Sequence, residues 1–295
     1  MRHYRFATVD VFTERRFGGN QLAVLPDAQG LSDEEMQAIA AEFNFSETAF
    51  VLPASDPAHS ARVRIFHRTG ELPFAGHPNV GTGFVLAREG RDADGVLRFE
   101  ELAGIIDVQV ARDRNGAPTG ATITAPQALA FAAEVPAPTI AACAGLAPND
   151  IVTKRHHPIV ASMGTPFVFA EVTPDALSRA TPDLSAFRRA VAKRPELEGR
   201  FPLHLYARMV DCVRTRMFAP LDGTFEDPAT GSANATLGGL LLSHTNDEQA
   251  AFTVLQGVEM GRPSRLDVIA RRTPDGIRAT VGGGCVAVTA GEINV

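Results

Sequence analysis

Apolar and polar residues alternate from Tyr4 to Phe12, a period of two that is typical of a half-buried strand. The pattern changes at Ser32, which together with Glu35 has the spacing of a capping box. Apolar residues then recur at helical spacing, so we predict an amphipathic helix over residues 33–43. The short apolar run Glu47–Pro53 predicts the next strand.

Further apolar runs separated by turn residues predict short strands through the rest of the chain. They are Ala61–Phe66, Ile105–Ala111 and Ala121–Ala125 in the first half, and Pro166–Val172, Leu203–Arg208, Asp211–Phe218, Arg265–Ala270 and Arg278–Val281 in the second. Many short strands with few helices between them favour an antiparallel α+β arrangement over a regular alternation of strands and helices.

The segment from Pro126 to Pro148 differs from its surroundings, because it is rich in alanine and interrupted by prolines. Stretches of this kind mark loops and boundaries. A chain of 295 residues is long enough for two domains of ordinary size. We therefore expect an N-terminal half over residues 1–127 and a C-terminal half over residues 128–286.

Two short stretches of the chain repeat one another. Residues 71–79 read ELPFAGHPN and residues 226–234 read EDPATGSAN, with Glu, Pro, Gly and Asn in the same register. We call them the first turn and the second turn. The tripeptide Arg64-Ile-Phe66 precedes the first turn, and Arg216-Met-Phe218 precedes the second. Because order, spacing and context agree, we interpret the chain as two homologous halves.

Each turn leads into a predicted helix, residues 78–89 in the first half and residues 231–243 in the second. Both helices contain internal glycines, and each glycine costs about 1 kcal/mol relative to alanine in a helix interior. A helix keeps such residues where other backbone must approach closely. We therefore predict that each helix is central and is wrapped by the strands of its own half.

The start of each predicted helix is a candidate binding site. The first turn of any helix presents unpaired N–H groups and the positive end of the helix dipole. Two such ends facing each other across a domain interface would form a pocket for a carboxylate-bearing substrate. His77 in the first turn and Ser232 in the second stand at equivalent positions in this arrangement.

Each candidate residue also has a purely structural interpretation. Asp227 followed by Pro228 resembles a plain helix cap, with aspartate at the N-cap and proline at N1. His77 could serve only in capping or packing, and Ser232 could be a small residue at a helix start. Glu47 opens an apolar strand, where a buried carboxylate is costly, so it lies at the surface or has a function.

The composition is that of an ordinary globular protein, with 45% hydrophobic and 21% charged residues. The formal net charge of −6 is spread without a basic block, which argues against nucleic acid or an anionic membrane as the main partner. We find no membrane-length apolar run and no signal-peptide pattern, so we expect a cytoplasmic protein. The cysteines Cys143, Cys212 and Cys285 are too far apart to indicate a disulfide framework or a zinc site.

Taken together, the motifs resemble those of the phenazine-biosynthesis PhzF-like family. The motifs that carry the resemblance are Val9–Phe12 with Gly19-Asn20, Glu42–Thr48, Glu71–Pro78, Glu226–Ala233 and Gln256-Gly257 with Met260–Ser264. Five motifs in the same order over essentially the whole chain are a far more specific signal than any one of them.

This resemblance implies a diaminopimelate epimerase-like fold of class α+β. Two pseudo-symmetric halves, each a strand-rich barrel around a central helix, would enclose an active site in the cleft between them. In that fold the last strand returns to the first domain, which would bring residues 287–295 to the N-terminal half. Family members are commonly homodimers, and the resemblance implies no cofactor and no metal.

The resemblance also implies an activity and a set of site residues. The family's best-understood reaction is the isomerisation of trans-2,3-dihydro-3-hydroxyanthranilate by proton shuttling. The acid/base glutamate of the family matches Glu47, and the residues that hold the substrate and assist proton movement match His77 and Asp227. The implied substrate-binding residues are Asn20, Ser46, Gly76, Gly231 and Ser232.

The chain departs from related folds at the two turns. Diaminopimelate epimerase and proline racemase have a cysteine in each equivalent loop, whereas this chain has His77 and Ser232 there. Racemisation by two thiols is therefore disfavoured, because neither loop offers a thiolate base. Two alternatives to the isomerase remain: a cofactor-independent epimerase of another small amino or hydroxy acid, and a non-catalytic protein that binds a metabolite. Glu47 discriminates between them, since a pure binding protein needs no carboxylate at that place.

Overall fold

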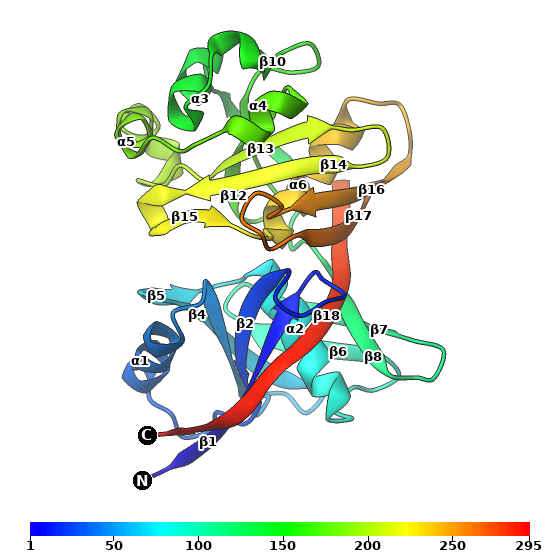
Figure 1. Cartoon of the computed structure of the whole chain (residues 1–295). Helices are drawn as coiled ribbons and strands as arrows, with labels where there is room; N and C mark the ends of the chain where they lie inside the picture. Colours follow the sequence, from blue (N-terminus) through cyan, green and yellow to red (C-terminus); the bar gives the residue numbers. More distant parts are fainter. The chain divides into compact units, whose positions relative to one another are not determined.

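The computed structural model describes residues 1–295, which form two compact units (Figure 1). Unit 1 comprises Met1–Pro126 together with Val281–Val295, and unit 2 comprises Gln127–Thr280. The final strand contributes residues to both units. None of the helices is long and apolar enough to span a lipid bilayer.

Unit 1 contains most of the strands of the first half of the sequence and two helices. Its elements are β1 (His3–Val11), β2 (Asn20–Leu25), α1 (Asp33–Phe43), β3 (Glu47–Leu52), β4 (Ala61–His67), β5 (Gly70–Leu72), α2 (Gly76–Arg88), β6 (Val96–Glu101), β7 (Gly104–Arg112), β8 (Pro118–Thr124) and the larger part of β18 (Gly276–Asn294).

Unit 2 contains more helices than unit 1. Its elements are β9 (Ala130–Glu134), α3 (Ala137–Ala144), η1 (Pro148–Asp150), β10 (Ile151–Val152), β11 (Ile159–Ser162), β12 (Pro166–Val172), α4 (Pro174–Arg179), α5 (Leu184–Val191), η2 (Pro195–Leu197), β13 (Leu203–Arg208), β14 (Val213–Ala219), η3 (Pro220–Asp222), β15 (Thr224–Asp227), α6 (Gly231–Ser243), β16 (Gln249–Gln256) and β17 (Ser264–Thr273).

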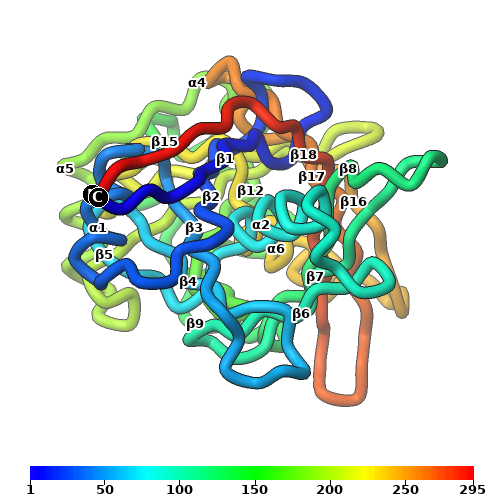
Figure 2. The backbone as a smooth tube through the Cα atoms, turned by 90° about the horizontal axis from the view of Figure 1, so that it is seen from below, coloured from blue at the N-terminus to red at the C-terminus, as the bar shows by residue number.

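The strands of unit 1 close into a barrel. The hydrogen-bonded order is β18–β1–β2–β3–β4–β6–β7–β8, and β8 pairs with β18 again, so the ring has no free edge. β1 and β18 run side by side as an antiparallel pair from His3 with Asn294 to Val11 with Cys285 (Figure 2). The return of the last strand therefore completes the barrel of the first unit.

Helix α2 fills the interior of this barrel. Every residue from Gly76 to Ala87 is buried, which explains why the helix is apolar or small on all sides. A Cβ atom at Gly83 would lie 2.6 Å from Cγ1 of Val108, and one at Gly81 would lie 2.5 Å from Cδ2 of Leu22. The glycines thus make room for strand side chains, and our expectation that backbone would approach them is wrong at these positions.

Unit 2 repeats the ladder of unit 1. The order β11–β12–β13–β14–β16–β17 has the same parallel and antiparallel pairings as β1–β2–β3–β4–β6–β7, and β15 pairs with β14 as β5 pairs with β4. α6 is the buried central helix. A Cβ atom at Gly238 would lie 2.5 Å from Cγ1 of Val268, the counterpart of the contact between Gly83 and Val108. The pseudo-symmetry predicted from the two turns is confirmed.

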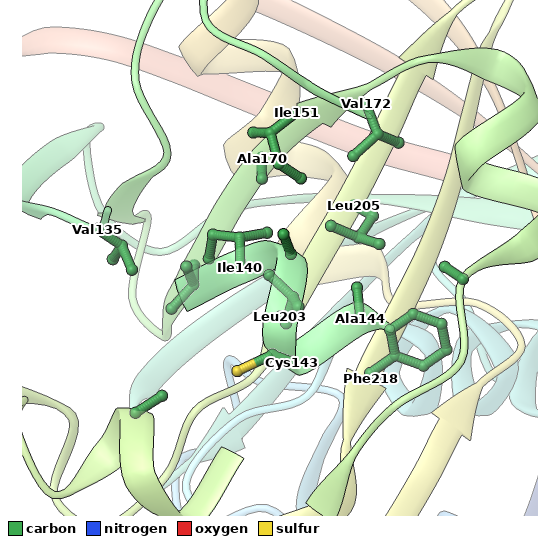
Figure 3. Packing of buried hydrophobic residues seen from close by; sticks show 14 of the residues in the cluster. Val135, Ile140, Cys143, Ala144, Ile151, Ala170, Val172, Leu203, Leu205 and Phe218 are labelled. Atoms are coloured by element: carbon green, nitrogen blue, oxygen red, sulfur yellow. The ribbon is translucent and has the colours of Figure 1, made fainter. Parts of the chain in front are cut away.

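A second layer covers unit 2 on the side of β12 and β13. Helices α3 and α5 pack there in an apolar cluster that includes Ile140, Phe187, Leu203 and Leu205 (Figure 3). In unit 1 a smaller cluster around Met36 of α1 has the same role. These layers stabilise the outer face of each barrel and leave the starts of α2 and α6 to other contacts.

The strongest sequence signals correspond to observed elements. Helix 33–43 is confirmed with its capping box, in which Ser32 and Glu35 each bond to the backbone of the other. The predicted helix 231–243 is confirmed, and the other central helix starts two residues earlier than predicted, at Gly76. Three outer helices, α3, α4 and α5, were not predicted, and neither were eight strands: β2, β5, β6, β9, β10, β11, β15 and β16.

Candidate active site

Glu47 is the first residue of β3, and the end of α1 sets where that strand begins. Asn44 ends α1 in the left-handed conformation (φ 54°), with its N–H donating to the carbonyl of Ala40. The chain then enters β3 between β2 and β4, where Glu47 pairs with Leu22 on one side and His67 on the other. The carboxyl group is therefore anchored to the wall of the unit 1 barrel.

Asn20 and Ser46 fix the orientation of the His77 ring. Ser46 Oγ donates to Asn20 Oδ1 (3.1 Å), and Asn20 Nδ2 lies 3.3 Å from Nδ1 of His77. Because an amide N–H can only donate, Nδ1 accepts this bond and the neutral imidazole has its proton on Nε2. Asn20 and His77 are both buried, which makes this orientation well defined.

Glu47 lies next to the protonated nitrogen of His77. Its Oε2 is buried and 3.5 Å from Nε2 of the ring. Burial raises the pKa of Glu47 to about 7, although the contact with the Ser46 side chain and the positive charge of Arg68 favour the carboxylate. Near neutral pH this carboxyl group is therefore present in both protonation states, as a group that takes up and returns a proton must be.

Gly76 and His77 are the first two residues of α2. The N-cap residue, Ala75, has no side chain that can cap the helix, and the first helical turn contains no acidic residue. Asn79 holds the backbone instead, since its Nδ2 donates to the carbonyl of Ala75 (3.0 Å). The N-cap side chain therefore leaves the amides at the start of α2 uncapped. Uncapped amides at a helix start are what an anion site requires.

Asp227 is the last residue of β15, so its interpretation as a plain helix cap is wrong. α6 begins at Gly231, with Thr230 at the N-cap position. Asp227 is buried, and its Oδ2 accepts a hydrogen bond of 2.5 Å from Thr230 Oγ1. The carboxylate is thus held beside the start of α6 without capping it.

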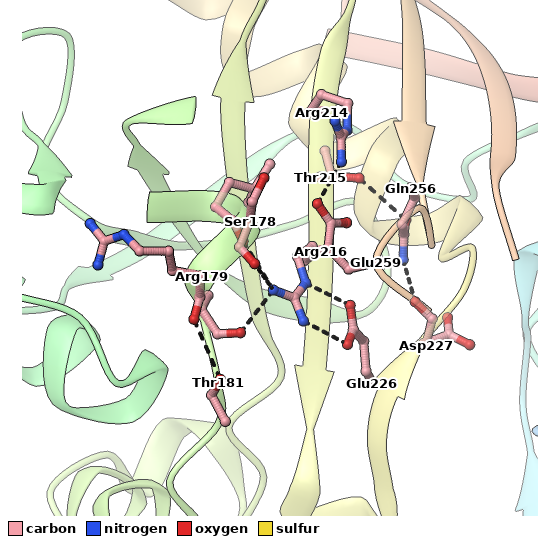
Figure 4. Close-up of polar contacts among 12 residues, drawn as sticks. Ser178, Arg179, Thr181, Arg214, Thr215, Arg216, Glu226, Asp227, Gln256 and Glu259 are labelled. Atoms are coloured by element: carbon pink, nitrogen blue, oxygen red, sulfur yellow. Dashed lines mark hydrogen bonds and ion pairs between the residues drawn. The ribbon is translucent and has the colours of Figure 1, made fainter. Parts of the chain in front are cut away.

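Gln256, the last residue of β16, ties the second turn together. Its Nε2 donates to the carbonyl of Asp227 (2.8 Å) (Figure 4) and to Thr230 Oγ1 (3.0 Å). Its Oε1 accepts from Asn234 Nδ2 (2.7 Å), which also donates to the carbonyl of Thr230 (3.0 Å). Gln256 and Asn234 are completely buried, so water cannot reach their side chains. These hydrogen bonds satisfy their polar atoms within the protein instead.

Gly231 and Ser232 occupy the positions in α6 that Gly76 and His77 occupy in α2. Gly231 is buried and Ser232 is half-buried. As in α2, no side chain caps the helix and no acidic residue lies in its first turn. The start of α6 therefore presents the same type of amide group to an anion.

An arginine–glutamate pair precedes the helix in each unit. Arg64 binds Glu71 through Nε (2.7 Å) and Nη2 (2.6 Å), and Arg216 binds Glu226 through Nε (2.7 Å) and Nη2 (2.9 Å) (Figure 4). Arg216 Nη1 also donates to the carbonyl of Ala180 (2.8 Å). These bidentate pairs attach the first residue of each turn to the neighbouring strand.

The two turns contain no thiol. Cys143 in α3 and Cys285 in β18 are buried, and burial raises the pKa of each thiol to about 12. Cys212 lies between β13 and β14. No group of three or more His, Cys, Asp or Glu side chains is arranged to hold a metal ion. The side chains of the turns that can exchange protons are therefore carboxyl, imidazole and hydroxyl groups.

The structure groups the predicted site residues by unit. Unit 1 brings together Asn20, Ser46, Glu47, Gly76 and His77, and unit 2 brings together Asp227, Gly231 and Ser232. Sequence reasoning missed the supporting roles of Asn79, Asn234 and Gln256. The two asparagines could have been found, because they close both copies of the repeated stretch in the same register.

Strands wrapped around a buried central helix, found once in each half of the chain, are the architecture of the diaminopimelate epimerase-like class of protein. A PhzF-family phenazine biosynthesis protein from Bacillus anthracis has a TM-score of 0.87 to this chain at 26% identity, covering 100% of both chains. A hydroxyproline epimerase from Agrobacterium vitis shares the fold, with a TM-score of 0.65 at 14% identity over 99% of this chain and 92% of its own. The predicted fold class is confirmed.

Sequence comparison identifies the family within this class. Residues 9–291 match the phenazine biosynthesis-like protein family, PhzC-PhzF. The chain is 36% identical over 305 residues to an uncharacterized isomerase of Mesorhizobium japonicum, covering 99% of both proteins. It is 35% identical over 267 residues to the trans-2,3-dihydro-3-hydroxyanthranilate isomerase of Pseudomonas aeruginosa, covering 89% of both. The chain belongs to the PhzF family and is an isomerase of this family.

Proposed function

We propose that this isomerase moves a proton between carbons of a small carboxylate-bearing substrate without a cofactor, and that its reaction is of the trans-2,3-dihydro-3-hydroxyanthranilate isomerase type. The single observation that supports this most strongly is the state of Glu47. Its Oε2 is buried beside a histidine, and its pKa is raised to about 7. The name of the Pseudomonas aeruginosa relative supplies the substrate to test first.

In the proposed reaction Glu47 acts first as base and then as acid. Its carboxylate removes a proton from a carbon next to a conjugated system, and the electron pair of the broken C–H bond is delocalised into that system. The same carboxyl group then gives the proton to a second carbon, and the carboxylate is regenerated. One group can do both when its pKa lies near the working pH, since neither transfer is then strongly uphill.

His77 and Asn20 orient the reacting groups in this proposal. Asn20 donates to Nδ1 of His77, so the ring presents its Nε2 proton toward Glu47 and the substrate beside it. A neutral N–H donor favours the carboxylate form of Glu47 before proton removal, and it can also hold an oxygen or nitrogen of the substrate. The substrate carboxylate would bind to backbone amides at a helix start, such as that of Gly76 in α2.

Racemisation by paired thiols receives no support from the structure. His77 and Ser232 stand where that chemistry would need cysteine, and the buried thiols of Cys143 and Cys285 lie outside the turns. The pKa of each of these thiols is raised to about 12, so neither would be a thiolate near neutral pH.

The experiment that tests the proposal is proton NMR of trans-2,3-dihydro-3-hydroxyanthranilate incubated with the purified chain in D₂O. We expect the double bonds to migrate, with deuterium entering the product at the carbon that receives the proton. Inversion of a stereocentre without migration, seen instead with small amino or hydroxy acids, would favour an epimerase. Binding without any hydrogen exchange would favour a metabolite-binding protein and overturn the proposal.

A further inference from the structure

Glu101 is a buried carboxyl group that the proposed reaction does not use. It is the last residue of β6, and both of its side-chain oxygens are buried without a hydrogen-bond partner. In the short connection between β6 and β7, the N–H of Ala103 donates to the carbonyl of Pro73 in the first turn (3.1 Å). An acid with no partner at this depth is costly, so its position calls for an explanation.

The counterpart of Glu101 in unit 2 is Gln256. Strand β6 pairs in parallel with β4 as β16 pairs in parallel with β14, and Arg62 faces Glu100 as Arg214 faces Leu255. The next residue of each strand is therefore Glu101 in unit 1 and Gln256 in unit 2. In unit 2 that residue is bonded to Asn234, and in unit 1 the side chain beside Glu101 is the equivalent asparagine, Asn79.

The side-chain amide of Asn79 has a hydrogen-bond partner for its nitrogen only, whereas that of Asn234 has partners for both its nitrogen and its oxygen. Both donate from Nδ2 to the N-cap carbonyl of their helix at 3.0 Å. Asn234 Oδ1 also accepts from His204 (3.1 Å), whereas Asn79 Oδ1 is buried without a partner. The register explains the difference, because the position equivalent to His204 in unit 1 is Ala49, which has no donor. Unit 1 thus has an unsatisfied amide oxygen next to an unsatisfied carboxyl group.

We propose that Glu101 is a positioning residue of the first turn, whose neutral carboxyl group forms a two-bond pair with the side-chain amide of Asn79. The carboxylic O–H donates to Asn79 Oδ1, and the other carboxyl oxygen accepts from Nδ2. Asn79 in turn holds the carbonyl of Ala75, the residue before Gly76 and His77. The pair needs the proton of Glu101, since a carboxylate has no donor for an amide oxygen.

The surroundings of Glu101 favour the neutral acid. Burial raises the pKa of Glu101 to about 8, and the Asn79 amide acts in the other direction. The titratable and charged groups on the elements around it are Arg98 and Glu100 on β6, Arg62, Arg64 and His67 on β4, Glu71 on β5, Asp107 and Arg112 on β7, and His77 and Arg88 on α2. None of them is among the causes of the shift, and Arg64 is bound to Glu71.

The first test does not depend on any substrate. The melting temperatures of the wild type and of Glu101→Gln are measured between pH 5 and pH 9. The unfolded chain loses the Glu101 proton near pH 4.5, whereas the folded chain keeps it up to about pH 8, so ionisation opposes folding in this range. We expect the wild type to lose stability relative to Glu101→Gln as pH rises from 5 to 8. Parallel curves would overturn the proposal.

The second test uses the proposed reaction. The role of Glu101 in positioning His77 rests on that proposed function. One unit above its pKa only about a tenth of the acid is neutral, so wild-type kcat should fall about tenfold by pH 9. Glu101→Gln, whose amide can form the same two bonds, should lack this fall, and Glu101→Leu should be impaired at every pH. Glu100→Gln is the matched control, because Glu100 is bound to His59 and should leave the fall unchanged.

The two tests separate this proposal from the proposed function. If the chain does not isomerise the proposed substrate but the melting curves diverge as described, the Glu101–Asn79 pair is supported and the proposed reaction is wrong. If activity is found but Glu101→Gln retains the alkaline fall, the positioning role is wrong. Carbon-13 NMR of the Glu101 carboxyl group gives a direct check, and titration near pH 4.5 would contradict the pair.

Discussion

The first and second turns share a scaffold and differ in the groups that titrate. Both have the arginine–glutamate pair, the asparagine that holds the N-cap carbonyl, and the glycine packed against a valine. At the positions that vary, unit 1 has His77 and Glu101 where unit 2 has Ser232 and Gln256. Glu47, also in unit 1, corresponds to Pro202 in the register of the two ladders.

This difference teaches how a repeated fold can specialise one copy. In unit 2 the buried polar network around Gln256 is built from amide and hydroxyl groups, and the hydrogen bonds of Gln256 form without a change of protonation. In unit 1 Glu101 stands in the place of Gln256 and Glu47 in the place of Pro202, and burial raises the pKa values of these two acids to about 8 and about 7. In the proposed mechanism the proton chemistry therefore belongs to unit 1, which differs from unit 2 in these side chains and not in its strand pairing.

The largest expected effect concerns the shared scaffold. Arg216 is more enclosed than Arg64, with 8% against 13% of its side chain exposed, and only Arg64 has a second acidic partner, Asp33. Glu226→Gln should therefore destabilise the fold by about 3 kcal/mol, the cost of leaving a buried charge poorly paired. Glu71→Gln should cost about 1 kcal/mol. Urea unfolding of both variants measures this, and equal losses would contradict the difference in burial.

The next effect concerns the residues that distinguish the turns. His77→Asn removes the imidazole beside Glu47 and should lower kcat about 10²-fold, the lower range for loss of a group that assists proton transfer. Ser232→Ala at the equivalent position should lower kcat less than tenfold, because it removes a hydroxyl group and leaves the backbone amides in place. Steady-state kinetics on the substrate proposed above decides between them, and a larger loss for Ser232→Ala would reverse the assignment.

A smaller effect is expected where the two units agree. Alanine at Gly83 or Gly238 would place Cβ 2.6 Å or 2.5 Å from a valine methyl group. Overpacking of this kind costs about 1–3 kcal/mol, partly offset by the gain of about 1 kcal/mol in helix propensity. Thermal unfolding should show a similar loss for both variants. Stabilisation of either one would show that its barrel is not closely packed at that point.

The smallest predicted effect is the pH dependence set by Glu47. Only the carboxylate of Glu47 can remove a proton. The ionisation of Glu47 should therefore leave kcat constant above pH 7 and lower it about tenfold for each pH unit below pH 7. The profile is best recorded in Glu101→Gln, where the alkaline change is absent. An acid limb centred near pH 4.5 would mean that burial does not raise the pKa of the catalytic acid.

Much of the fold follows from local sequence patterns. The helix 33–43 has a complete start signal, and the glycine-rich helices after the two turns stand out because of the repeat. Strands β2, β6 and β16 have weaker signals, since their faces are defined by partners far away in sequence. Helices α3 and α5 lie in the alanine-rich segment and beyond it, where apolar packing against β13 decides the structure.

The candidate site divides in the same way. Glu47, His77 and Asp227 could be named from motifs, because the motifs quote them directly. The role of Glu101 could not, since it depends on the register of β6 with β4 and on its contact with Asn79. Asp227 was open to interpretation as a helix cap until the start of α6 was located at Gly231. Long-range pairing is what local patterns leave undetermined.

The measurement that tests the central claim most directly is hydrogen exchange by Glu47→Gln in D₂O, followed by proton NMR, with substrate binding measured by calorimetry on the same sample. The substituted amide keeps the shape of the native side chain but cannot accept a proton from carbon. We predict affinity within a few-fold of the wild type and exchange reduced at least 10³-fold, within the range for loss of a general acid–base group. Exchange at the wild-type rate with intact binding would contradict the account.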